Sequence, residues 1–150
     1  MERKYCQQFS LDQPIDAVFP LFSPEGERKW VPEWDYAEIR GCNPLTEDAV
    51  FLTRHHDHAA EPAIWLVKRY EPQTYFVEYY KVEPDSKISI IQVSCTQIAP
   101  RTTRITVCYE YIGLTQAGNE FIASFTETDY ADYIREWEGL LKSYFKSQKQ

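Results

Sequence analysis

The pattern of apolar and polar positions predicts a strand, two short helices, a long series of strands and a final long helix. Alternation over residues 3–11 puts Tyr5, Gln7, Phe9 and Leu11 on one face, which favours a strand. Apolar residues from Ile15 to Phe22 then recur at helical spacing, Pro20 keeps this helix short, and Ser23-Pro24 starts a second one over residues 25–29.

The middle of the chain predicts an antiparallel meander, because strand-like runs alternate with Gly, Pro, Asn and Asp clusters. The expected strands cover residues 36–40, 49–56, 63–71, 74–83, 87–98 and 103–114. Short connections between consecutive strands imply antiparallel pairing. The last two runs exceed the usual strand length, which favours a sheet that curls around something.

The C-terminal third predicts one helix from a Thr115 cap to Phe145. Its apolar stripe mixes hydroxyl groups with large rings, whereas a dry core would favour Leu, Ile and Val. The stripe contains Ile122, Thr126, Tyr130, Tyr133, Ile134, Trp137, Leu140, Leu141 and Tyr144. The whole chain is therefore expected to be a single α+β domain, residues 1–150, in which a curved antiparallel sheet of about seven strands wraps around a long C-terminal helix.

A segment with two tryptophans, Trp30-Val-Pro-Glu-Trp-Asp35, follows the short helices. Together with the order of elements and the Pro14-Ile-Asp-Ala-Val-Phe19 start, it resembles the START-like (SRPBCC) superfamily, which includes pollen-allergen-type proteins, polyketide cyclases and lipid-transfer domains. The resemblance also rests on residues 65–72 and 103–111 and covers the chain from about Tyr5 to Phe145. It implies a helix-grip fold with a long cavity between the sheet and the last helix.

The resemblance makes a small hydrophobic or amphipathic molecule, such as a lipid, sterol or polyketide, the expected partner. Aromatic walls with a few polar tips suit such a ligand. The sheet residues expected to face it include Val77 and Val107, and a one-residue error in strand phase would turn each of them outward. The candidate ligand-binding residues are Trp30, Trp34, Trp65, Tyr79, Tyr109, Thr126, Tyr130, Tyr133 and Trp137.

Two other functions stay open from the sequence. A cyclase or dehydratase would need a base near a polarised carbonyl, and His56, Tyr79, Tyr109 or Tyr130 could serve in a cavity. A protein-interaction module, as in chaperone-cofactor relatives, would suit the negative charge of the chain. No G-x-S-x-G, P-loop or G-x-G-x-x-G motif is present, so no catalytic residue is assigned and no cofactor is expected.

The three histidines fall in one cluster, Arg54-His-His-Asp-His58. His55, His56 and His58 could ligate a metal with Asp57 or Glu61, but no third ligand from elsewhere is evident. A polar hairpin tip explains the same residues, and no metal is predicted.

Net charge and cysteine content limit the expected partners and the expected cellular compartment. A net charge of −7 with scattered basic residues argues against nucleic acid and against an anionic membrane surface as the main partner. No signal segment or apolar span is visible, so a cytoplasmic protein without integral membrane association is expected. Cys6, Cys42, Cys95 and Cys108 form no C-x-x-C pair and are expected to be reduced and buried. The oligomeric state is not predicted.

Overall fold

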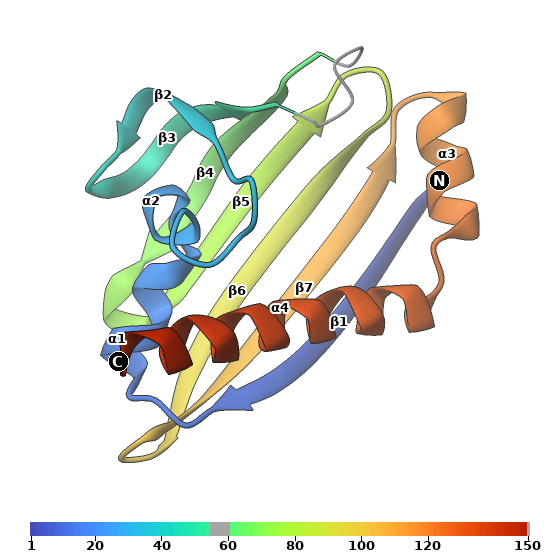
Figure 1. Ribbon diagram of the computed structural model, residues 1–150. Coiled ribbons are helices and arrows are strands. Elements are labelled where there is room, and N and C mark those ends of the chain that lie inside the picture. Colours follow the sequence, from blue (N-terminus) through green and yellow to red (C-terminus); the bar gives the residue numbers. More distant parts are fainter. Residues whose placement is uncertain (55–60, 150) are drawn as a thin grey trace.

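The computed structural model describes residues 1–54 and 61–149 and has one seven-stranded antiparallel sheet gripping a C-terminal helix (Figure 1). The predicted histidine cluster, including its possible metal ligands His55, His56 and His58, lies outside the described residues. Within the described residues, no group of three or more His, Cys, Asp or Glu side chains could hold a metal, and no helix is long and apolar enough to cross a membrane.

The sheet is built from strands that are consecutive in the chain, apart from the first, which pairs with the last. Its order is β1-β7-β6-β5-β4-β3-β2. The strands are β1 (Glu2–Leu11), β2 (Tyr36–Cys42), β3 (Leu45–Thr53), β4 (Ala63–Glu71), β5 (Phe76–Glu83), β6 (Lys87–Ala99) and β7 (Thr102–Gly113). The predicted meander and its antiparallel pairing are therefore confirmed.

Short helices fill the region between β1 and β2. They are α1 (Ile15–Val18), the 3-10 turn η1 (Phe19–Phe22) and α2 (Pro24–Glu27), and a second 3-10 turn, η2 (Pro72–Thr74), joins β4 to β5. The Ser23 hydroxyl caps α2 by accepting a 2.9 Å hydrogen bond from the Gly26 amide. A Cβ at Gly26 would lie 2.0 Å from the Pro20 carbonyl oxygen, so only glycine lets α2 pack this closely on η1.

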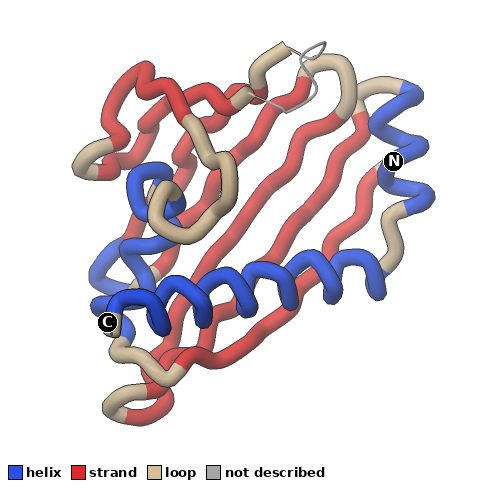
Figure 2. The backbone as a smooth tube through the Cα atoms, in the orientation of Figure 1, coloured by secondary structure: helices blue, strands red, loops and turns tan. Residues whose placement is uncertain are grey.

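The expected single C-terminal helix is wrong, because two helices occupy that region. They are α3 (Gln116–Ser124) and α4 (Glu127–Gln148), and Figure 2 shows the loop between them. Thr126 caps α4 through its hydroxyl, which accepts from the Asp129 amide, while the Asp129 carboxylate accepts from the Thr126 amide. This reciprocal capping box starts a new helix and turns the chain between α3 and α4.

The core lies between α4 and the concave face of the sheet. Tyr130, Ile134, Trp137 and Leu141 form the buried stripe of α4, as the helical spacing predicted. The strand residues that were expected to face inward also do so. The sheet residues Trp65, Val77, Tyr79, Val107 and Tyr109 are all at most 8% exposed.

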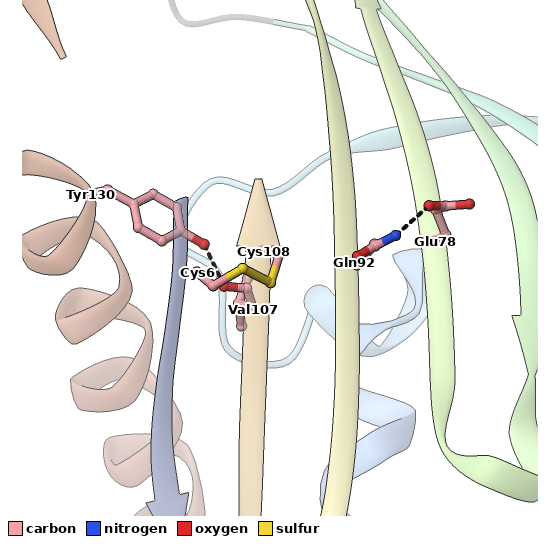
Figure 3. The surroundings of a disulfide bond; sticks show 6 residues. All are labelled: Cys6, Glu78, Gln92, Val107, Cys108 and Tyr130. Carbon is pink, nitrogen blue, oxygen red and sulfur yellow. Dashed lines mark hydrogen bonds between the residues drawn. A yellow bond between two sulfur atoms is a disulfide. The ribbon is translucent and has the colours of Figure 1, made fainter. Parts of the chain in front are cut away.

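Cys42 and Cys95 are free and buried, as expected. The expectation of reduced thiols is wrong for the other two cysteines. Cys6 and Cys108 lie directly opposite each other on β1 and β7, with a Cα–Cα distance of 4.1 Å, and form a disulfide (Figure 3). Because Tyr5 points to the helix side, Cys6 points to the outer, convex side of the sheet. Cross-strand register brought these two thiols together, and spacing in the sequence could not reveal it.

Candidate functional site

A cavity of about 330 Å³ opens on the concave face, beside the half of the sheet that α4 fills. Its walls come from α2 and the tryptophan segment on one side, from β4 to β7 on the sheet, and from α3 and α4 on the other side. The lining residues are Glu27, Val31, Trp34, Trp65, Lys81, Glu83, Lys87, Ser89, Tyr109, Tyr111, Phe121, Phe125, Tyr133 and Trp137.

Strand register explains why these side chains meet. In one rung across the sheet, Trp65 lies opposite Lys81, Lys81 opposite Ser89, and Ser89 opposite Tyr111. All four point to the concave face, because strand residues two apart share a face and Tyr79 and Tyr109 are buried there. The sheet therefore presents a rung that runs from an indole through an amine and a hydroxyl to a phenol.

Aromatic rings form one part of the cavity wall. The Trp34 ring lies edge-on to Trp65 at 5.9 Å between centroids, and the Trp34 indole nitrogen donates a 2.8 Å hydrogen bond to the Pro24 carbonyl. Trp65 is anchored in turn, since its indole nitrogen donates to the Thr53 hydroxyl at 2.8 Å. Both rings are thus held in fixed orientations by hydrogen bonds at their polar edges, and the Trp65 ring also stacks on Phe51 at 5.3 Å between centroids.

Charged groups form another part of the wall. The Lys87 ammonium lies 3.4 Å from a Glu83 carboxylate oxygen and 4.1 Å from the centre of the Phe121 ring. The Lys81 ammonium lies 4.0 Å from the same oxygen and 5.3 Å from the centre of the Trp65 ring. Two ammonium groups therefore share one carboxylate, and Lys87 is the more closely held of the two.

Glu27, the last residue of α2, brings a second carboxyl group to the cavity. Desolvation by the surrounding protein raises its pKa well above the ordinary value, and the charge of Lys81 opposes that shift. Desolvation also lowers the pKa of Lys81, with the Lys87 charge adding to the effect and Glu83 and Glu27 opposing it. Desolvation thus shifts the pKa of each group toward its uncharged form, a carboxylic acid for Glu27 and an amine for Lys81.

Two phenols complete the polar groups. The hydroxyls of Tyr109 and Tyr133 lie 3.4 Å apart, within hydrogen-bond reach. Desolvation is the largest cause that raises the pKa of each, so both remain neutral phenols. Such groups can donate a hydrogen bond to a ligand, whereas a general base would need a lower pKa.

The structure separates the nine candidate residues into two groups. Trp34, Trp65, Tyr109, Tyr133 and Trp137 line the cavity.

The other four candidates have different positions. The Tyr79 and Tyr130 hydroxyls donate to the backbone carbonyls of Phe22 and Val107 at 2.7 and 2.6 Å (for Tyr130, Figure 3), and both rings are core. Trp30 is buried behind the wall, donating to the Leu21 carbonyl at 2.7 Å. Thr126 is an exposed helix cap. The polar groups of all four are bound by backbone, and none of the four is among the lining residues.

Sequence reasoning missed the charged residues and two phenylalanines, Phe121 in α3 and Phe125 directly after it. Lys81 and Glu83 continue the inward phase of Val77 and Tyr79, so the alternation of β5 carried a usable signal. Phe121 and Phe125 stack at 4.9 Å and contact Tyr111. The sequence pattern carried no such signal for these two phenylalanines, because the single continuous helix that it predicted placed them outside the apolar stripe.

Comparison with known proteins gives matches in structure but not in sequence. No family model matches the chain, and no curated protein matches its sequence. A major latex-like protein from Panax ginseng superimposes with a TM-score of 0.72 at 15% identity, covering 95% of this chain and 97% of that one. A START superfamily protein from Mycobacterium smegmatis gives a TM-score of 0.71 at 9% identity, covering 97% and 98%. This chain has the START-like helix-grip fold.

One further structural neighbour is an enzyme. A point mutant of norcoclaurine synthase from Thalictrum, in complex with a transition-state analogue, gives a TM-score of 0.70 at 8% identity and covers 99% of this chain and 97% of that one. Identities this low establish the START-like fold alone, so the function has to be argued from the cavity of this chain.

Proposed function

We propose that this protein binds a small amphipathic molecule in the cavity between the sheet and α4. The observation that carries the proposal is the combined lining of the 330 Å³ cavity, in which indole rings lie beside amine, carboxyl and phenol groups. Small-molecule sites are typically concave and mostly apolar, with a few convergent polar groups. Ligand-binding neighbours of the same fold are consistent with this use of the interior.

Size and charge restrict the ligand. The cavity lies at the lower end of the roughly 300–1,000 Å³ range of small-molecule pockets, which favours a compact molecule over a long lipid chain. Its apolar part would lie against Trp34, Trp65 and Trp137. Lys81 and Lys87 both line the cavity on its sheet side, so an anionic or carbonyl oxygen would be directed toward their nitrogen atoms.

Tryptophan fluorescence tests the proposal, because three of the four tryptophans line the cavity. Titration with a medium-chain fatty acid, a sterol and an aromatic polyketide should give a saturable change for at least one of them. The Trp65→Phe variant should lose part of that change, and Trp30→Phe, the control outside the lining, should keep all of it. No saturable response in any arm would contradict the proposal.

For the enzyme alternative, the cavity offers other candidate residues than those named from the sequence. Tyr79 and Tyr130 are hydrogen-bonded to backbone carbonyls, and the phenols of Tyr109 and Tyr133 stay protonated, so a tyrosine base has little support. The amine and carboxyl groups that share the cavity are better candidates for chemistry, and one structural neighbour of this fold is an enzyme.

A further inference from the structure

We propose that Lys81 is an amine nucleophile that forms an imine with the carbonyl group of a small aldehyde or ketone in the cavity, with Glu27 transferring the protons. The inference rests on the proposed function, because the carbonyl compound must enter the same cavity. It adds a covalent step and names the chemical class of the ligand.

The first support is the position of Lys81. It lies in the middle of the sheet rung, between Trp65 on β4 and Ser89 on β6, with its ammonium over the Trp65 ring. Trp34 lies edge-on to that ring, so an aromatic or branched carbonyl compound would have an apolar wall beside the amine. A nucleophile needs this kind of placement, on a rigid element and against the site where its partner is held.

The second support is the difference between the two lysines. The Lys87 nitrogen lies 3.4 Å from a Glu83 carboxylate oxygen and 4.1 Å from the centre of the Phe121 ring, so two contacts hold it in place. Lys81 is at 4.0 Å from Glu83, the outer limit of an ion pair, and Lys87 is a second positive charge near it. A lysine that is desolvated and close to another cation is the arrangement that frees an amine for attack on a carbonyl.

The third support is the carboxyl group of Glu27, which reaches the cavity from α2, on another wall than the amine. Serine capping of α2, the close packing of Gly26 on Pro20 and the Trp34–Pro24 hydrogen bond fix the position of this helix. Burial keeps the carboxyl group protonated over a wider pH range than in water, and Lys81 is the charge that it senses. An acid in the same cavity as the amine can supply the proton that imine formation requires.

The step balances without an oxidant or a further reactant. The neutral Lys81 amine attacks the carbonyl carbon, the C–N bond forms, and a proton moves from nitrogen to the former carbonyl oxygen to give a carbinolamine. Glu27 then gives its proton to the hydroxyl, the C–O bond breaks and water leaves as the nitrogen lone pair forms the C=N bond. The products are an iminium ion on Lys81, a Glu27 carboxylate and water.

Reductive trapping tests the inference on the wild-type protein. The protein is incubated with benzaldehyde and sodium cyanoborohydride, which reduces an imine to a stable benzylamine, and the labelled lysines are found by peptide mass mapping. Lys68 is the matched control. Its ammonium also lies over an aromatic ring, 4.9 Å from the centre of the Tyr80 ring, but Lys68 does not line the cavity. Lys81 should be labelled about tenfold faster than Lys68, in line with an activated amine.

Two variants sharpen the test. Glu27→Gln should slow labelling of Lys81 by about tenfold or more, the lower range of acid–base catalysis, and leave Lys68 unchanged. Lys81→Arg keeps the charge and should abolish the cavity adduct while the circular dichroism spectrum stays that of the wild type. Labelling of Lys81 no faster than of Lys68 would overturn the inference. Tryptophan fluorescence measured with the same benzaldehyde then decides separately whether the proposed binding survives.

Discussion

The two halves of the concave face differ in how their tyrosine hydroxyls and other polar groups are held. In the filled half, the hydroxyls of Tyr79 and Tyr130 each donate to a backbone carbonyl, of Phe22 and Val107, and the rings are at most 4% exposed. In the cavity half, the Tyr109 and Tyr133 hydroxyls lie 3.4 Å apart, and Lys81 and Lys87 both interact with Glu83. The first half is built for stability, and the second retains polar groups that a ligand could contact.

The difference follows from the residues that each strand presents inward. Along β5 the inward positions change from Val77 and Tyr79 to Lys81 and Glu83, and along β6 they change from Ile91 to Ser89 and Lys87. Lysine and glutamate side chains are costly to bury unless they are paired, so they remain at the open part of the sheet. A change of polarity along one inward face thus marks where the core ends and the candidate site begins.

The largest effect should come from the filled half. Leu141→Ala removes a side chain that is 0% exposed and should lower the free energy of unfolding by about 2–5 kcal/mol, as core truncations do. Leu140→Ala, at the neighbouring half-buried position, is the control and should cost clearly less. Urea denaturation measures both, and equal costs would show that α4 does not bury the stripe described here.

Removing the disulfide on the convex side of the sheet tests how much β1 and β7 contribute to the stability of the filled half. Cys6 and Cys108 are 102 positions apart in the chain, and their disulfide joins β1 to β7. Strand β7 also carries Val107, whose backbone carbonyl accepts the hydrogen bond from the Tyr130 hydroxyl. Replacing both with serine should lower stability by about 2–4 kcal/mol, since an intact cross-link restricts the unfolded chain. Ligand affinity should hardly change. A marked loss of affinity at unchanged stability would contradict the separation of the two halves.

A pair of tyrosine substitutions compares the halves directly. Tyr130→Phe leaves the buried Val107 carbonyl without its side-chain donor and should cost about 1–2 kcal/mol. Tyr133→Phe removes a hydroxyl that lies 3.4 Å from its partner, on a residue that is 38% exposed, and should cost less than about 0.5 kcal/mol. Thermal unfolding gives both values, and a reversed order would refute the assignment of Tyr130 to the core and Tyr133 to the site.

The smallest effect should be a pH dependence from Glu27. Its pKa is raised in the folded state, so between the ordinary pKa and the raised one the native protein binds more protons than the unfolded chain. The stability contributed by this group is therefore present at acid pH and is lost as pH rises through the folded-state pKa. Glu27→Gln should gain stability relative to wild type as pH rises above the ordinary glutamate pKa, measured by denaturant unfolding. A relative loss over that range would mean that the carboxylate is stabilised in the fold.

Most of the fold could be predicted from the sequence, because the order of strands and the apolar stripe of α4 are local patterns. The break between α3 and α4 was also encoded locally, in the Thr126-x-x-Asp129 capping box, but the continuous helical stripe concealed it. The Cys6–Cys108 pair could not be predicted, since it depends on the register between β1 and β7.

The candidate site was predicted less completely. The aromatic wall followed from Trp34, Trp65 and Trp137, but the charged wall needed the strand phase to be followed beyond Tyr79. Which phenols are bound by backbone carbonyls, as Tyr130 is, depends on tertiary contacts between residues far apart in the chain. A sequence pattern identifies a residue as inward-facing, and only the packing shows whether it is core or cavity.

The indole N–H resonances of the four tryptophans offer the most direct test of the central claim that the cavity binds a small amphipathic ligand. A ligand that gives a saturable fluorescence change is added to ¹⁵N-labelled protein, and each signal is assigned by a Trp→Phe variant. The signals of Trp34, Trp65 and Trp137 should shift together and saturate, while Trp30, bonded to the Leu21 carbonyl behind the wall, should shift least. Shifts confined to Trp30, or the absence of any shift at saturating ligand, would contradict binding in this cavity.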